Sequence, residues 1–442
     1  MATVVETEKV SLRHHPDFLK LWLSETISQF GGQFSGFAIP LTAIFYLNAN
    51  AAQLGYLGFT GFVGWPLFGL FVGVYVDRHH RQRIMVVANI FRGIFLASIP
   101  VVAVLGLLNF LGIVLLYLVS FAVGVLQVFF DVSYQAYLPS LVAREQLVEG
   151  NSKLEASRSS AQVVGPFSAG LVIAIITAPI AIAIDAGSFL TSASVLARIR
   201  IRESLPTPLT HPSVMHDIRE GLAVIFNDKR LRSIAGSTGT ANFFGTAWGT
   251  ILLLYFATPP PGGLGVPRLQ VGIVAGIIFS VASVGALAGV ALAGPLSRRL
   301  GLGSAITLGM ILGGVGGFAF YFAGPATVNP YFTVLGFAVT PSILLMIAGN
   351  FVTFIGVVVY NINQVSLRQA IVPIRLQGRM NASIRFLVWG TIPAGALAGG
   401  LLGTVLGLRP AIGITVIGGA LAFLWVLFSP VRSMKTVPEP LE

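Results

Sequence analysis

Four ionisable side chains interrupt stretches of sequence that are otherwise apolar, and these residues could carry chemistry: Glu25, Arg92, Asp131 and Asp185. A charged group in hydrocarbon costs roughly 2.5–3.5 kcal/mol even on the lenient insertion scale, so each needs a function or a partner. A buried carboxylate can take up and release a proton, and a buried arginine can neutralise it. No Asp or Glu occurs between residues 231 and 430. A carboxylate proton carrier must therefore come from the N-terminal half or from the linker that follows it.

Glu25 begins a polar stripe on the first apolar stretch. Gln29 and Gln33 follow at steps of four, with Ser28 beside them, so a helix places all four on one face. Such a face on an apolar helix should line a water-filled cavity. The functional interpretation is a carboxylate that alternately binds a proton or a cationic substrate. The alternative is a structural hydrogen bond near the helix end.

Asp185 and Arg92 are the remaining proton-coupling candidates. Asp185 lies near the middle of an apolar stretch, where it is either a structural aspartate with its hydrogen bonds satisfied or a proton site. Arg92 can neutralise Asp185 or Glu25, and the sequence does not choose between them.

A second group of charges lies in residues 73–83, between two apolar stretches. Six of the seven side chains at 77–83 are ionisable, so this segment must be a loop at a water interface. We interpret Gly73, Asp77, Arg78, Arg81 and Asp131 as a conformational latch. Gly73 would let a neighbouring helix approach, and Arg81 would pair with Asp131. The alternative is a set of charges that only fixes topology.

The elements that position these residues are membrane-spanning helices. The 442-residue chain is 55% hydrophobic and only 10% charged, whereas soluble domains carry about 25% charged residues. A spanning helix needs about 20 apolar residues. We predict an all-α membrane protein with twelve such helices, at 18–47, 52–76, 84–108, 111–134, 151–176, 179–198, 233–257, 270–296, 304–324, 342–366, 384–406 and 410–429.

The basic residues predict the orientation of these helices. With twelve spans both termini lie on one side, and almost all Lys and Arg residues fall in loops of that side. Only Arg268 and Arg409 belong to the opposite loops. Both termini are therefore expected in the cytoplasm, and the net charge of +11 reflects topology rather than nucleic-acid binding. The chain has no cysteine, and the paired histidines lack further ligands, so we expect no disulfide, metal site or cofactor.

The chain divides into two similar halves. We expect a cytoplasmic tail at 1–17, a six-helix bundle at 18–198, a cytoplasmic linker with a short amphipathic helix at 199–232, a second six-helix bundle at 233–429 and a tail at 430–442. The segment 131–139 recurs loosely at 364–373, and 293–299 corresponds to 73–78, with Ser297 in place of Asp77. Two pseudo-symmetric six-helix bundles are typical of transporters whose site lies between the repeats.

Six stretches together resemble the major facilitator superfamily, and in it the twelve-helix drug:proton antiporters, which include macrolide and tetracycline efflux pumps and enterobactin exporters. They are the charged motif at 77–83 and the segments 130–139, 147–151, 165–170, 185–189 and 217–221. The resemblance implies proton antiport by alternating access, with Asp77 facing the eleventh helix near Arg379–Arg385. The chain departs from the family at helix 4, where the Arg-x-x-Gln-Gly pattern is absent and Gln127 is the one polar residue nearby.

The expected substrate cavity is rich in aromatic and amide side chains, which suit amphipathic ligands. Its candidates are Gln29, Phe30, Gln33, Phe34, Gln127, Asn242, Phe243, Trp248, Asn350, Asn361, Asn363 and Trp389. Many of them are alternatively packing residues or interfacial anchors.

We therefore predict a plasma-membrane exporter that functions as a monomer in lipid and exchanges small molecules for protons. A siderophore or another secreted metabolite is the alternative cargo. No nucleophile–base pair supports an enzyme, and the repeat argues against a channel.

Overall fold

The structure is a computed structural model that describes residues 12–201, 203, 214–324, 332–334 and 337–436. Parts of both predicted tails and of the predicted linker, including Arg202, lie outside these residues.

The N-terminal half consists of long helices that coincide with the first six predicted spans. They are α1 (Pro16–Tyr46), α2 (Ala51–Phe62), α3 (Gly64–Asp77), α4 (Arg81–Val104), α5 (Leu108–Leu141), α6 (Leu147–Ile176) and α7 (Ala178–Leu196), with short 3-10 turns η1 (Leu12–His14) and η2 (Arg144–Gln146). The second predicted span is two helices, α2 and α3, which meet at Val63.

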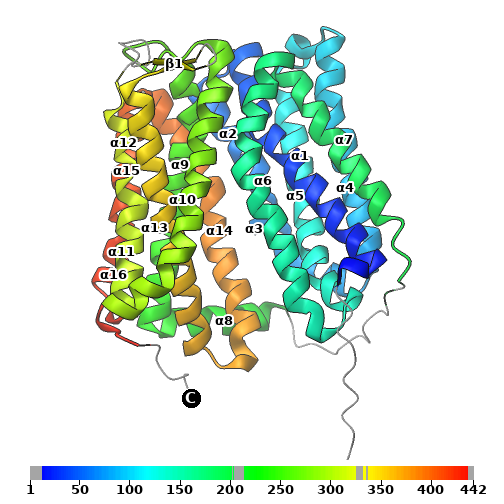
Figure 1. Ribbon diagram of the computed structural model, residues 1–442, viewed down its shortest axis with the longest axis vertical. Helices are drawn as coiled ribbons and strands as arrows, with labels where there is room; N and C mark the ends of the chain where they lie inside the picture. The colour runs from blue at the N-terminus through cyan, green and yellow to red at the C-terminus, as the bar shows by residue number, and fades with distance from the viewer. Residues whose placement is uncertain (1–11, 202, 204–213, 325–331, 335–336, 437–442) are drawn as a thin grey trace, which may run out of the picture.

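The C-terminal half repeats this arrangement after an amphipathic helix, α8 (Val214–Asn227). Its helices are α9 (Lys229–Ala257), α10 (Val271–Leu300), α11 (Leu302–Val315), α12 (Phe318–Phe322), α13 (Pro341–Ile371), α14 (Ile374–Val405), α15 (Leu408–Ala420) and α16 (Leu424–Leu427). Short 3-10 turns are η3 (Arg268–Gln270), η4 (Leu421–Phe423) and η5 (Pro430–Ser433). Two strands, β1 (Phe332–Val334) and β2 (Phe337–Val339), pair antiparallel at the end opposite α8 (Figure 1).

Nine helical segments of the described chain are long and apolar enough to cross a membrane, and the bent pair α2 and α3 would make a tenth. The more polar α1 and α9 run alongside them: α1 packs on α6 and α7, and α9 packs on α14 and α15. Figure 1 shows the helices of the two halves side by side, with α8 across one end.

The hydrophobic core is shared by the two halves at one end only. At the end opposite α8, one buried cluster joins Leu41 and Leu57 of the first half to Leu252 and Val274 of the second. Toward α8 the core splits into separate clusters, one around Met85 in the first half and others within each half. The bundles are therefore sealed together at one end and less tightly joined at the other.

Two glycine contacts bring the helices together at the sealed end. A Cβ on Gly400 of α14 would lie 2.7 Å from Cα of Gly55 in α2. A Cβ on Gly170 of α6 would overlap the carbonyl oxygen of Gly272 in α10. Any larger side chain at these positions would push the two halves apart, so the close approach requires glycine.

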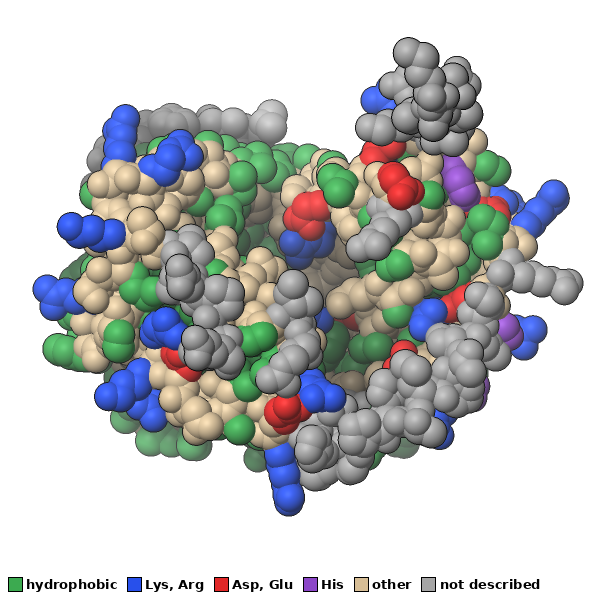
Figure 2. Space-filling model, turned by 90° about the horizontal axis from the view of Figure 1, so that it is seen from below, with side chains coloured by type: hydrophobic (Ala, Val, Ile, Leu, Met, Phe, Trp, Pro, Cys, Tyr) green, Lys and Arg blue, Asp and Glu red, His purple; other side chains and the backbone are tan. Residues whose placement is uncertain are grey.

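The face at the other end carries the start of α1 and the end of η5, and Figure 2 shows Lys and Arg side chains spread around its rim. A pocket of about 350 Å³ opens between the halves here, lined by residues of α3, α5 and α14 that include Trp65, Gln135 and Arg385. Across the gap, Arg385 Nη1 donates a hydrogen bond to Gln135 Oε1 at 3.2 Å.

Candidate functional site

The polar stripe of α1 lines a pocket inside the N-terminal bundle. The pocket has a volume of about 220 Å³, and its lining comes from α1, α4, α5 and α7: Glu25, Ser28, Gln29, Gly32, Gln33, Arg92, Gln127, Phe130 and Phe189. Three of the four ionisable residues singled out from the sequence lie in or beside this pocket, because Asp131 is hydrogen-bonded to Gln127.

Arg92 occupies the centre of this polar cluster and is only 6% exposed. Its guanidinium donates to Gln127 Oε1 and, at 3.2 Å, to Asn89 Oδ1. The guanidinium carbon lies 3.7 Å from the ring centroid of Phe189, which is a cation–π contact. Asp185, Asp131 and Glu25 all interact with it electrostatically. Arg92 thus lies within electrostatic range of all three carboxylates, and which of Asp185 and Glu25 it neutralises stays a prediction.

Gln127 joins the arginine to Asp131. Its side-chain oxygen accepts from Arg92, and its Nε2 donates to Asp131 Oδ1 at 2.6 Å. One amide can do both only because it carries a donor and an acceptor. Gln127 lies on α5, the fourth predicted span, from which the family pattern is missing, and it bridges Arg92 and Asp131.

Glu25 is buried, with 6% of its surface exposed, and only one of its oxygens is hydrogen-bonded. Oε1 accepts from Gln29 Nε2 at 2.6 Å, whereas Oε2 has no hydrogen-bond partner among the residues described. Leaving a buried carboxylate oxygen unsatisfied costs about 1–3 kcal/mol or more. A proton or a ligand group would remove this cost.

Asp185 is 2% exposed and lies where α7 packs on α1. Its Oδ1 accepts from Ser188 Oγ at 3.1 Å. A Cβ on Gly31 of α1 would overlap Ser188, so the two helices touch at this point. Asp185 is not among the residues that line the polar pocket. Its surroundings fit the structural alternative better than the proton site.

The latch residues do not make the contacts that we expected. Arg81 pairs with Glu203 at 2.6 Å, and its backbone N–H donates to the same carboxylate at 2.8 Å. The predicted Arg81–Asp131 pair is wrong, because Asp131 is turned toward Gln127 inside the bundle. Glu203 was not among the residues singled out from the sequence.

The start of the loop is also more open than predicted. Nothing lies within 4 Å of a Cβ built on Gly73, so no helix approaches closely there, which corrects that expectation for this conformation. The Asp77 side chain is 69% exposed and lies 3.9 Å from the guanidinium of Arg81. Arg78 is exposed and follows the last residue of α3. In the described chain Asp77 makes no ion pair with α14 in this conformation, and the predicted facing contact stays a prediction.

A second, larger cavity lies between the two bundles. Its volume is about 720 Å³, and its lining comes from both halves: Gln33, Gly36, Phe37, Ile39, Pro40, Leu54, Leu57, Gly58, Gly61, Phe62, Ser120, Gln162, Pro166, Thr246, Gly249, Thr250, Leu252, Leu253, Phe279, Ser283 and Phe354. None of these lining residues is ionisable. Gln33 also lines the polar pocket, so the two cavities meet at the end of the α1 stripe.

Most of the other cavity candidates lie elsewhere. Four of them, Asn242, Trp248, Asn350 and Asn361, line a separate cavity of about 240 Å³ within the C-terminal half. Three others, Phe30, Phe34 and Phe243, line none of the cavities described here.

The last two candidates make packing contacts. Asn363 is buried and donates to the Val359 carbonyl at 2.8 Å. Trp389 packs edge-on against Trp65, with 4.6 Å between their ring centroids, in the pocket on the α8 side. Of the cavity candidates predicted from the sequence, Gln33 lines the central cavity, whereas the aromatic residues in the wall of this cavity were not predicted.

Comparison with known proteins matches the model of the Major Facilitator Superfamily to residues 21–340. Macrolide efflux protein A of Streptococcus pyogenes is 26% identical over 218 residues, 48% of this chain and 52% of the relative. The Enterococcus faecalis protein of the same name is 28% identical over 169 residues, 38% of this chain and 51% of the relative. The chain thus spans about half the length of the curated relatives it matches.

Solved structures share the fold over almost the whole chain. A bacterial homologue of the iron transporter ferroportin in its inward-facing state has a TM-score of 0.71 at 17% identity, covering 94% of this chain and 98% of its own. The outward-facing state of such a homologue gives 0.58 at 19% identity, covering 93% and 98%. The predicted fold class is confirmed.

Proposed function

Because this chain belongs to the Major Facilitator Superfamily, we propose that it is a secondary transporter that exports hydrophobic or amphipathic small molecules from a bacterial cell in exchange for protons. One observation carries the proposal: a neutral cavity of about 720 Å³ between the bundles adjoins a pocket with a buried, half-satisfied carboxylate. Cargo and proton would then bind in neighbouring sites joined by Gln33.

The lining of the central cavity indicates the chemistry of the cargo. Its volume falls in the usual range for small-molecule sites, about 300–1,000 Å³. The aromatic rings of Phe37, Phe62, Phe279 and Phe354 supply apolar surface, while scattered amides and hydroxyls such as Gln162 supply a few hydrogen bonds. Because an ion entering this cavity would meet no opposite charge, the cargo should bind in a neutral form or keep its charge outside. A large, mostly apolar molecule such as a macrolide could bind in this way. The matched relatives are named macrolide efflux proteins, which supports the same class of cargo.

The alternative cargo, an anionic siderophore, fits less well. An anion would favour a cavity with Lys or Arg in its wall, and the described lining contains neither. The nearest buried cation, Arg92, already interacts with three carboxylates.

Glu25 is our proton carrier. In the anionic form, Glu25 Oε2 stays without a hydrogen bond, and Glu25 adds a further negative charge to the carboxylates near Arg92. Protonation makes the Glu25 side chain neutral and gives it an O–H donor. Such a change alters the free-energy difference between two conformations whenever the site is hydrated differently in each. Gln29 and Gln33 extend from Glu25 toward the cargo cavity, so occupation of one site can influence the other.

We further propose that both termini are cytoplasmic and that the conformation described here is open toward the cytoplasm. The basic rim in Figure 2 supports this orientation, since loops rich in Lys and Arg stay in the cytoplasm. The glycine contacts and the shared core then close the outer side. The exposed Asp77 would find its partner on α14 only after the bundles rock together at the cytoplasmic side.

A transport screen in inside-out vesicles tests the proposal. A labelled macrolide and a labelled siderophore are each offered with and without an imposed proton gradient. We expect gradient-dependent accumulation of the macrolide and none of the siderophore. Accumulation of the siderophore alone would replace the proposed cargo, and accumulation of the macrolide that ignores the gradient would refute proton exchange.

A further inference from the structure

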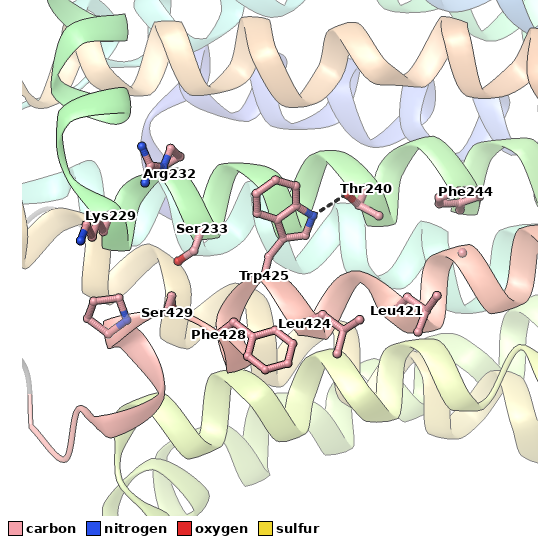
Figure 3. Close-up of a pocket in the computed structure, with 12 residues that line it drawn as sticks. Lys229, Arg232, Ser233, Thr240, Phe244, Leu421, Leu424, Trp425, Phe428 and Ser429 are labelled. Carbon is pink, nitrogen blue, oxygen red and sulfur yellow. Dashed lines mark hydrogen bonds between the residues drawn. The ribbon is translucent and has the colours of Figure 1, made fainter.

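A groove on the outer surface of the C-terminal bundle has a cationic end and an apolar wall. It encloses about 590 Å³ between α9 and the segment from α15 to η5, and its lining is Lys229, Arg232, Ser233, Thr240, Phe244, Gly418, Leu421, Leu424, Trp425, Phe428, Ser429 and Pro430. In Figure 3, Lys229 and Arg232 lie at one end, Trp425 lies between the helices and Phe244 lies at the other end. The groove shares no residue with the central cavity or with the polar pocket.

The apolar wall is preformed and faces outward. Phe428 is 82% exposed and Trp425 is 50% exposed, so both present their rings to whatever surrounds the bundle. The indole of Trp425 is held in place, because its Nε1 donates to Thr240 Oγ1 at 3.0 Å and the ring lies on Gly236, where a Cβ would come within 2.7 Å of it. A ligand that enters this groove therefore meets a fixed aromatic surface.

Within the described residues, the cationic end is not neutralised by an acid. Lys229 and Arg232 are exposed, and neither forms an ion pair within the part of the chain that the structure describes. The nearby Asp228 is engaged by Arg230, at 2.6 Å, and by the backbone N–H groups of Arg230 and Leu231. Since no Asp or Glu occurs between residues 231 and 430, no other helix of this bundle supplies one. Two unpaired cations beside an apolar channel favour an anion with an apolar tail.

We propose that this groove binds an anionic phospholipid, with its phosphate between Lys229 and Arg232 and an acyl chain along Trp425 and Leu421 toward Phe244. The dimensions agree: α9 rises about 22 Å from residue 229 to residue 244, and one leaflet with its headgroup region is about 20–22 Å deep. The cationic end lies at the start of α9, next to α8 and on the side of the basic rim, where headgroups of a bilayer would be (Figures 1 and 2). A soluble phosphate would use the cations but leave the apolar wall unused.

Quenching of tryptophan fluorescence by brominated lipid tests this site. Trp425 is the exposed one among the five tryptophans, and the others are half-buried. The purified full-length protein is placed in phosphatidylcholine vesicles with increasing amounts of dibrominated phosphatidylglycerol. The same titration is carried out with W425F. The difference in quenching between the parent and W425F reports the lipid that occupies the groove.

We expect the double variant K229Q/R232Q to need about 30-fold more phosphatidylglycerol for half of this quenching, which corresponds to about 1 kcal/mol per cation at 1.4 kcal/mol per tenfold. The matched control is R298Q/R299Q, which removes two exposed cations of the same face that do not line the groove. The control should match the parent.

Several results would overturn the proposal. One is equal half-quenching concentrations for the double variant and the parent, and another is an equal loss in the control, which would indicate general surface charge. If dibrominated phosphatidylcholine quenches Trp425 as strongly as dibrominated phosphatidylglycerol, the groove holds ordinary surrounding lipid without selecting the anionic headgroup. Displacement by water-soluble glycerol phosphate at the same concentration would make this a soluble-anion site.

Discussion

Replacing Gly400 by alanine should shift the protein away from the conformation described here. A Cβ on Gly400 would lie 2.7 Å from Cα of Gly55; the Cβ position is fixed by its own backbone, and the Gly55 Cα is a backbone atom that cannot rotate away. Real Cβ contacts are longer than this, so α2 and α14 must separate by several tenths of an ångström. Overpacking of this kind costs typically 1–3 kcal/mol.

The penalty acts only on the state in which the two helices touch. If this contact opens when the outer side opens, a cost of about 2 kcal/mol changes the ratio of the two states by about 30-fold. A population dominated by the closed-outside state would then contain a large fraction of the open-outside state. The direction follows from the contact, because nothing in the substitution stabilises the sealed end.

Cysteine labelling measures this shift cleanly, since the natural chain has no cysteine. A single cysteine at Leu57, in the wall of the central cavity, is exposed to a membrane-impermeant maleimide from the outer side of intact cells. Gly400→Ala should label several-fold faster than the parent. The matched control is Gly187→Ala, where a Cβ meets nothing within 4 Å. Equal labelling rates for Gly400→Ala, the control and the parent would refute the reasoning.

Three further substitutions address the charged groups. Glu203→Gln leaves Arg81 without its buried carboxylate partner and should cost about 3 kcal/mol of stability, seen as a lower thermal unfolding midpoint in detergent. The exposed control Glu155→Gln should cost less than about 1 kcal/mol. Equal midpoints for the two variants would contradict the structure. Gln127→Leu removes the amide that joins the buried arginine to the carboxylate of α5, and should destabilise by about 1–3 kcal/mol in the same assay; an unchanged midpoint would mean that the bridge is not formed. Asp77→Asn should leave the midpoint unchanged, because this side chain is 69% exposed here, yet slow transport without abolishing ligand binding; transport equal to the parent would end the latch hypothesis.

The sequence predicted the helices well because hydrophobic length alone defines them. Each predicted span coincides with a helix or with a pair of short helices, even where α1 carries Glu25 and its glutamines. The break between α2 and α3 at Val63 was not predicted, since neither proline nor a polar residue stands at that position. The pattern of apolar residues does not predict a bend of this kind, because both helices are apolar.

The site was harder to predict because its contacts join residues far apart in the chain. Arg81 and Glu203 are 122 positions apart, and no periodic pattern in the sequence connects them. Asp131 was the expected partner because it lies near the predicted cytoplasmic end of its helix, but it is hydrogen-bonded to Gln127. The polar stripe from Glu25 to Gln33 was recognisable from spacing, because a helix brings residues four apart to one face. The aromatic wall of the central cavity resembles any other apolar helix surface until the two bundles are placed together.

The central claim is that Glu25 carries the proton that drives export, and substrate-induced proton release in proteoliposomes tests it most directly. A pH-sensitive dye reports protons released when a macrolide is added to the parent, to Glu25→Gln and to the surface control Glu155→Gln. We expect release from the parent and the control and none from Glu25→Gln, with macrolide binding by Glu25→Gln preserved. Proton release by Glu25→Gln equal to that of the parent would contradict the account.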